Sequence, residues 1–210
     1  MNKQVMAGKA IECRSHQIID RALRRFGYGG GDDEKVIVRR VVHATAEFSF
    51  SENLYIHSNA ITRGVAALGA GSRLICDVRM LAAGCTHSPL PVQCALDVAG
   101  NAELATKKGI TRSSAAFELL EDQLDGAIIA IGNAPTALRT VIALCTAPKG
   151  PSPALIIGMP VGFVDAKESK IALKTSGLVC ITNTSRKGGS PAAAAVFNAL
   201  CTLYKERSRV

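Results

Sequence analysis

The sequence predicts an α/β protein: a single three-layer α/β/α domain over residues 1–210, with a mainly parallel sheet of about five strands. Two observations lead to this prediction. Hydrophobic residues make up 48% of the chain and tryptophan is absent, so the core must consist of Ala, Val, Leu and Ile. In the second half, apolar runs are each followed by a small-residue or polar loop and then a helical stretch. This alternation is typical of a parallel sheet covered on both faces.

The first ~30 residues show the spacing of a helix through Ile18, Ile19 and Leu23. They end at the glycine-rich run 27–31, which we interpret as a flexible turn. It lacks both a preceding strand and the Lys-Ser/Thr of a phosphate-binding loop.

A second helix is predicted from the acidic run 32–34 to about residue 46, with Asp32 and Asp33 at its cap and Glu34 in its first turn. Its valines would also suit a strand, but the apolar positions do not alternate. As a helix, the stretch places four side chains on one face: Val36, Arg40, His43 and Glu47.

The remaining elements follow from apolar runs and turn residues. Strands are predicted at 73–78, 92–96, 127–131, 154–157 and 178–181, and helices at 58–70 (with Ile61, Val65 and Leu68 inward) and 111–124. Ligand sites in such folds gather beyond the carboxyl ends of the strands, so we expect the loops after the last three strands to lie near one another.

The net charge of +8, from 25 Lys and Arg against 17 Asp and Glu, favours an anionic partner. Nucleic acid is disfavoured because the basic residues are scattered and no aromatic residues are interleaved with them to stack bases. A membrane role is disfavoured because the chain has no apolar span of about 20 residues and no basic amphipathic helix.

The seven cysteines are odd in number and include no Cys-x-x-Cys pair, and several stand in apolar runs. The first ten residues also lack the apolar core of a signal peptide. These features predict reduced, mostly buried thiols in a cytoplasmic protein.

His43 is the first candidate for chemistry, because an imidazole transfers protons near neutral pH. An arbitrary histidine is more often a structural residue in the core or at the surface, hydrogen-bonded to the backbone. The four histidines lack metal-ligand spacing, so no zinc site is predicted. Neither the dinucleotide-binding glycine pattern nor the serine hydrolase elbow is present.

Three loops could hold anions. In 132–136, Pro135 suits the first turn of a helix whose free amides can bind a carboxylate, although an ordinary strand-to-helix turn reads the same way. The run 185–190 combines two cations, two glycines and a serine before an alanine-rich helix. Residues 168–170 add a cation and a hydroxyl. Together the loops suggest a polyanionic ligand.

At these residues the chain closely resembles the precorrin-8X methylmutase family of cobalamin biosynthesis, including its cobalt-precorrin-8 branch. The similarity runs nearly end to end. The matching segments are 14–15 with 18–19, 40–44, 75–80, 111–113, 130–138, 158–164, 168–170, 186–190 and 198–200. The long glycine- and proline-containing segments 130–138 and 158–164 are the most specific.

The resemblance implies a homodimeric isomerase that needs no cofactor or metal. It would move one methyl group between neighbouring carbons of a tetrapyrrole macrocycle, a polyanion that suits the net charge. His43 matches the catalytic histidine, which exchanges a proton with the macrocycle, and Ser15 and Arg40 match substrate-binding positions. From motif position and chemistry we expect five further substrate-binding residues: Thr86, Arg112, Asn133, Ser169 and Lys170.

Arginine binds carboxylates through two parallel hydrogen bonds, so Arg40 and Arg112 are the expected carboxylate clamps. The chain departs from the family at His16 and Gln17, where many members have Phe-Ala, and at the loop 86–89, which replaces a more arginine-rich one. Residues 44–48 are more similar to the cobalt-precorrin branch. A non-catalytic corrinoid carrier and a nucleic-acid-binding module are the competing hypotheses.

Overall fold

The computed structural model describes residues 3–208, and the side chains of residues 7–208. The helices are α1 (Lys3–Arg25), α2 (Asp32–Thr45), α3 (Phe50–Asn53), α4 (Ala60–Gly69), α5 (Arg79–Gly84), α6 (Asn101–Lys108), α7 (Arg112–Leu119), α8 (Pro135–Thr146), α9 (Ala166–Thr175) and α10 (Ser190–Arg207). Short 3₁₀ turns cover Ala95–Asp97 and Glu121–Gln123. The strands are β1 (Leu54–Ile56), β2 (Leu74–Cys76), β3 (Val92–Cys94), β4 (Ile128–Ile131), β5 (Leu155–Gly158) and β6 (Cys180–Asn183).

The strands form one mainly parallel sheet in the order β1-β6-β5-β4-β2-β3. All five predicted strands are present, and only β1 runs antiparallel to its neighbour, β6. The prediction missed β1, which is three residues long, lies at the sheet edge and is only half-buried. Such a strand leaves no long apolar run in the sequence.

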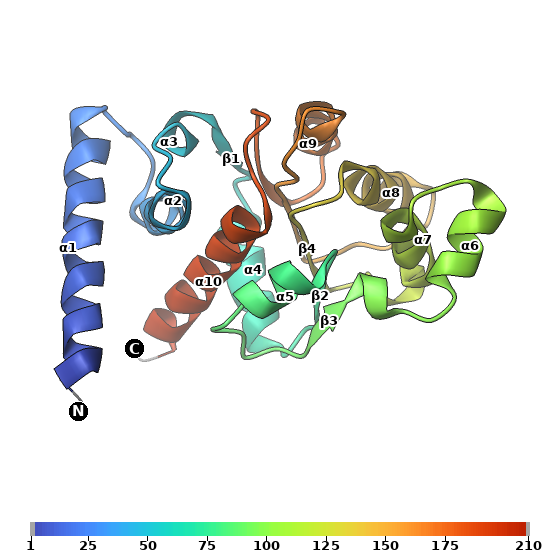
Figure 1. Cartoon of the computed structure of the whole chain (residues 1–210), viewed down its shortest axis with the longest axis horizontal. Helices are drawn as coiled ribbons and strands as arrows, with labels where there is room; N and C mark the ends of the chain where they lie inside the picture. Colours follow the sequence, from blue (N-terminus) through green and yellow to red (C-terminus); the bar gives the residue numbers. More distant parts are fainter. Residues whose placement is uncertain (1–2, 209–210) are drawn as a thin grey trace.

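Helices cover both faces of the sheet (Figure 1). Alternate residues of β4 show this directly: Ile128 and Ala130 pack in one hydrophobic cluster with α2, α4 and α10, whereas Ile129 and Ile131 pack in another with α7 and α8. Both sides of a central parallel strand are therefore apolar, as the predicted class requires.

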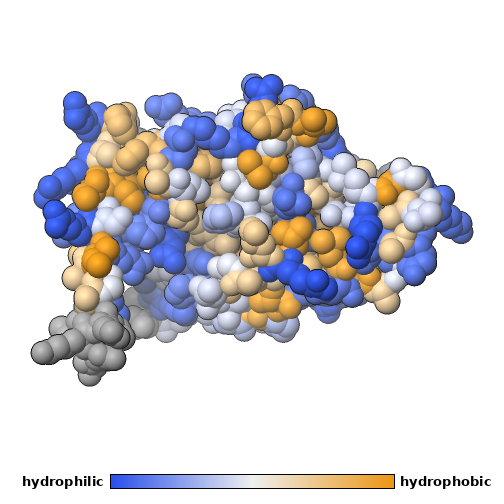
Figure 2. Space-filling model, viewed as in Figure 1, coloured by the Kyte–Doolittle hydropathy of each residue, from blue (hydrophilic) through white to orange (hydrophobic). Residues whose placement is uncertain are grey.

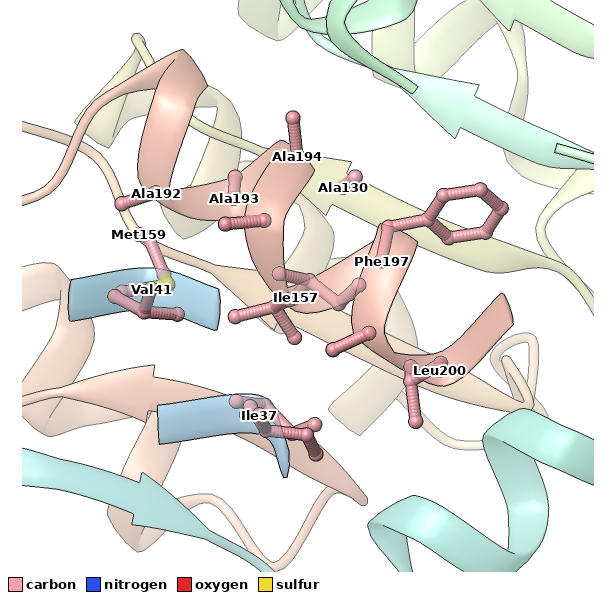
Figure 3. Close-up of a cluster of buried hydrophobic side chains, with 14 of the residues drawn as sticks. Ile37, Val41, Ala130, Ile157, Met159, Ala192, Ala193, Ala194, Phe197 and Leu200 are labelled. Atoms are coloured by element: carbon pink, nitrogen blue, oxygen red, sulfur yellow. The ribbon is translucent and has the colours of Figure 1, made fainter. Parts of the chain in front are cut away.

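Helix α10 is the centre of the first cluster. It packs extensively against α2, and its buried face meets residues of both α2 and the strands. Figure 3 shows Phe197 and Leu200 of α10 beside Ile157 of β5, with Ile37 and Val41 of α2 on the other side. Small alanines on α10 let these elements approach closely.

Helix α2 confirms the predicted helix and its end near residue 46, but it corrects the cap at its start and the place of Glu47. Gly31 is the N-cap, so Asp32 and Asp33 lie inside the first turn and do not cap it. The Glu34 carboxylate instead accepts a hydrogen bond from the Gly31 amide at 3.3 Å. The helix ends at Thr45, and Ala46 adopts a left-handed conformation (φ 54°). Glu47 therefore lies beyond α2 and is not on the face that carries Arg40 and His43.

Helix α1 lies at one edge of the molecule, where it packs along α2 (Figure 1). Its outer side exposes apolar residues, including Ile11 and Ile18, and Figure 2 shows hydrophobic surface along this helix at the left of the view. Within residues 3–208, none of the helices is long and apolar enough to cross a membrane.

Candidate active site

The site begins with a contact between α1 and α2. The Ser15 hydroxyl lies 2.9 Å from Nδ1 of His43, and both side chains are half-buried. Because Ser15 engages Nδ1, the other ring nitrogen, Nε2, is left to exchange a proton with a ligand, whichever tautomer is present. The geometry thus fits the predicted acid–base role of His43.

Arg40 lies one turn before His43 on α2, but its guanidinium is not free. Its Nη1 donates to Oε1 of Glu12 on α1 at 2.9 Å. This ion pair is partly exposed, with 28% of the Arg40 side chain open to solvent. A ligand carboxylate would share Arg40 with Glu12 or displace it.

Glu12, Arg40 and His43 form one wall of a cavity of about 470 Å³. The remaining lining comes from α5, the loop after it, and the first half of α10: Met80, Gly84, Thr86, Ser190, Pro191, Ala194, Ala195 and Asn198, with Ala44 beside His43. Four residues thus come together as predicted: Ser15 beside His43, and Arg40, His43 and Thr86 in the lining.

Asn198 is a residue of this wall that the sequence reasoning missed. Its Nδ2 donates to the Gly84 carbonyl at 2.9 Å, and its Oδ1 accepts from the His87 amide at 3.3 Å. It therefore ties the loop that carries Thr86 to α10. The available signal was a polar side chain in an otherwise apolar, alanine-rich helix, since a buried amide needs partners.

A second cavity of about 540 Å³ adjoins the first and shares Glu12 and Arg40 with it. Its lining adds His16 and Asp20 from α1, Arg39 from α2, and His87. Charged side chains of both signs surround this second cavity, and Arg39 pairs with Asp20 at 3.2 Å.

The structure places Ser169 and Lys170 beneath a loop. Both side chains are buried, and Ser169 donates its hydroxyl to the Ala166 carbonyl. The Lys170 ammonium donates to the Lys187 carbonyl at 2.6 Å, and burial lowers the pKa of Lys170 to about 8. Direct contact with a ligand would require this loop to move, so their substrate-binding role stays a prediction.

Arg112 and Asn133 lie outside the His43 cavity. Arg112 is on α7, which packs on the opposite face of the sheet, and its Nε donates to Asn101 at 2.9 Å. The Asn133 side chain is exposed after β4. Their contacts with substrate likewise remain predictions.

The helix N-terminus after β4 already holds a carboxylate, that of Asp77. Oδ2 of Asp77 accepts from the amides of Asn133 at 2.7 Å and Ala134 at 3.0 Å, while Oδ1 accepts from Gly132 at 3.2 Å. Pro135 opens α8 as predicted. The anion expected at this turn is therefore part of the protein, because Asp77 follows β2, the neighbour of β4.

The three loops predicted to meet do lie together. The Met159 amide donates to the Ile131 carbonyl at 2.8 Å, and the Gly189 amide donates to the Met159 carbonyl at 2.8 Å. A Cβ on Gly132 would stand 2.8 Å from the Ser190 Cα, so only glycine fits there. Of these loops, the last leads directly into the wall of the His43 cavity, because Ser190 and Pro191 at the start of α10 line it.

Comparison with known proteins identifies the family and the fold. Residues 10–203 match the sequence family described as precorrin-8X methylmutase. The chain belongs to the precorrin-8X methylmutase family. A precorrin-8X methylmutase of Pseudomonas aeruginosa is 44% identical over 201 residues, covering 93% of this chain and 95% of that protein. A cobalt-precorrin-8 methylmutase of Methanocaldococcus jannaschii is 39% identical over 174 residues, covering 83% and 81%.

A solved structure of a precorrin-8X methylmutase from Thermus thermophilus aligns with a TM-score of 0.83 at 33% identity, covering 94% of this chain and 98% of that one. This agreement confirms the α/β fold. Membership of the methylmutase family makes the chain an enzyme of the isomerase class.

Proposed function

We propose that the enzyme moves a methyl group between adjacent ring carbons of a precorrin-8-type macrocycle, with His43 as the group that exchanges the proton. The observation that carries this proposal is the Ser15–His43 contact at the edge of a cavity in a methylmutase-family chain. Nε2 of His43 gives a proton to the conjugated ring, the methyl group migrates to the neighbouring carbon, and a ring proton returns to Nε2. Substrate and product are isomers, so no other reactant is consumed.

The cavity chemistry supports an anionic macrocycle as the ligand. Arg40 offers a guanidinium to a carboxylate, and the Thr86 hydroxyl and Ser190 add polar groups on the opposite wall. The alanines of α10 and Met80 supply apolar surface for the ring itself. General acid–base catalysis of this kind contributes roughly 10²–10⁴ in rate, and orientation of the macrocycle must supply much of the rest.

The test is the visible spectrum after mixing the enzyme with metal-free and with cobalt-containing substrate. We expect conversion of at least one of them, and the one converted identifies the branch. His43→Ala should bind substrate without converting it, while His57→Ala, in the loop after β1, serves as the matched control. An active His43→Ala enzyme would disprove the role of His43. Tight binding without conversion by the wild-type protein would instead support a corrinoid carrier.

We also propose that residues 1–210 act as one methylmutase domain, in a homodimer, in the cytoplasm. The family match spans residues 10–203, and one sheet joins all described strands. Large apolar side chains remain exposed, with Phe163 at 89% and Val164 at 84%. All seven cysteines are free and five are buried, which suits a reducing compartment. Sedimentation equilibrium tests the dimer directly, and a monomer at micromolar concentration would refute it.

A further inference from the structure

His16 follows Ser15 on α1, and its ring lies against the ring of His43. The two ring centroids are 5.1 Å apart and the planes meet at 73°, which is an edge-to-face contact. Adjacent residues of one helix therefore engage the same imidazole: Ser15 contacts its Nδ1 and His16 packs on the ring.

The burial of one ring nitrogen of His16 and the charged side chains nearby determine how readily this imidazole takes up a proton. Its Nε2 is fully buried and has no hydrogen-bond partner within the described residues. The cations of Arg39 and Arg40 lie nearby on α2, paired with Asp20 and Glu12 of α1. An imidazole without a partner for a buried nitrogen, facing two cations, gains little from taking up a second proton.

We propose that His16 is a positioning residue for His43: it restrains the His43 ring by edge-to-face packing and, by staying uncharged, leaves His43 as the ring that carries the proton. The inference rests on the proposed function of His43. His16 itself needs no contact with the reacting atoms, since it lines the second cavity while His43 lines the first.

The pKa of His16 is lowered from its ordinary value, which agrees with a ring that stays uncharged. Burial lowers the pKa of His16, Arg39 and His43 lower it further, and Glu12 opposes them. A positive charge on the neighbouring His43 ring disfavours a second one on His16. His16 is therefore neutral at neutral pH. Acidification that protonates His16 places a second positive charge against His43 and should reduce turnover.

Two variants separate the ring from its charge. His16→Phe keeps an aromatic ring for the contact but cannot take a proton. We expect its kcat at about pH 7.5 to stay within about threefold of wild type, and its activity to decline less on acidification. His16→Ala removes the ring, and kcat should fall about tenfold while KM changes less, because the His43 ring is no longer restrained. His57→Phe is the control, and circular dichroism and melting curves confirm that each variant folds.

Imidazole NMR provides a readout that does not depend on turnover. The signal missing from His16→Phe identifies His16, which should titrate below 6.5, its ordinary value. In His43→Phe this titration should move to higher pH, since one positive neighbour is gone. Any of three results would overturn the inference. The activity of wild type and His16→Phe could decline identically on acidification, kcat could be unchanged in His16→Ala, or His16 could titrate at or above its ordinary value. Failure of the wild type to convert any substrate would instead refute the proposed function, while the NMR coupling still tests the ring pair.

Discussion

The Ser15 hydroxyl and Nδ1 of His43 are 2.9 Å apart although 28 residues separate them in the chain. The contact exists because α1 packs along α2, and it fixes which nitrogen of His43 remains available to a ligand. Ser15 thus lies where it would orient the His43 ring if His43 exchanges the proton, and its predicted contact with substrate stays a prediction.

Removal of the Ser15 hydroxyl should therefore affect turnover more than binding. Ser15→Ala is expected to lower kcat by about tenfold with a smaller change in KM, because the His43 ring loses the partner that fixes its orientation. Ser15→Thr retains a hydroxyl and should keep most of the activity. Steady-state kinetics of the two variants provide the measurement, and a change confined to KM would place Ser15 on the substrate.

Glu12 limits how Arg40 can bind an anionic ligand, because the two side chains form an ion pair. The guanidinium is already paired with this carboxylate at 2.9 Å, so a substrate carboxylate that binds Arg40 as proposed would have to compete for it. Glu12→Gln removes that competition and one negative charge from both cavities. We expect KM for the anionic substrate to fall about fivefold, with kcat changed less. Glu103→Gln, on the exposed side of α6, is the charge-matched control, and increased salt should reduce the difference between the two variants.

Much of the sheet could be predicted because buried parallel strands are continuous apolar runs, such as Ile128–Ile131 and Leu155–Gly158. The edge strand β1 could not, since half-buried, three-residue strands carry little pattern. At the site, the helical periodicity of α2 placed Arg40 and His43 together correctly. Glu47 was grouped with them because helix ends are hard to locate, and the left-handed Ala46 that ends α2 is not a glycine.

Contacts between side chains far apart in the sequence could not be predicted from the sequence pattern. Nothing in the pattern around Arg40 identifies Glu12 as its partner, and nothing around Gly132 identifies Asp77 as the carboxylate at that turn. These pairings arise from the packing of α1 on α2 and of β2 beside β4. Residue type indicates which groups need partners, whereas the fold decides which partners they receive.

Glu47 connects the end of α2 to the loop that leads into α10. Its carboxylate forms an ion pair with Lys187 at 2.5 Å and accepts from the Ser49 amide at 3.1 Å. The Lys187 hydrogen bond, followed by those from Ser49, lowers the pKa of Glu47 to about 2. The stabilisation is therefore present above the unfolded value of 4.5 and is lost as pH falls through about 2.

Glu47→Gln should lower the melting temperature slightly, and by a constant amount at neutral and mildly acidic pH. Glu47 of the wild type is ionised there in both the folded and the unfolded state. The difference from wild type should shrink as pH falls below 4.5, the unfolded value. Hydrogen exchange at residues 185–189 should also accelerate, since the loop loses one of its ties. Glu52→Gln on α3 is the control. A difference that grows on acidification would contradict the assigned ion pair.

Asp77 should be the residue whose loss most damages the fold near the site. Its buried carboxylate accepts from three backbone amides at the start of α8, and Asp77→Ala leaves those donors unpaired, so the free energy of unfolding should fall by about 3 kcal/mol or more. Asp77→Asn keeps the volume and one acceptor oxygen and should lose less.

Burial raises the pKa of Asp77 against the opposing effect of the amides, so the folded state holds this proton to higher pH than the unfolded chain does. The contribution of the group is therefore full below the unfolded value of 3.8 and declines as pH rises through the folded pKa, a slope that both variants should lack. Urea unfolding at several pH values measures both effects, and a wild-type midpoint for Asp77→Ala would show that the three amides find another acceptor.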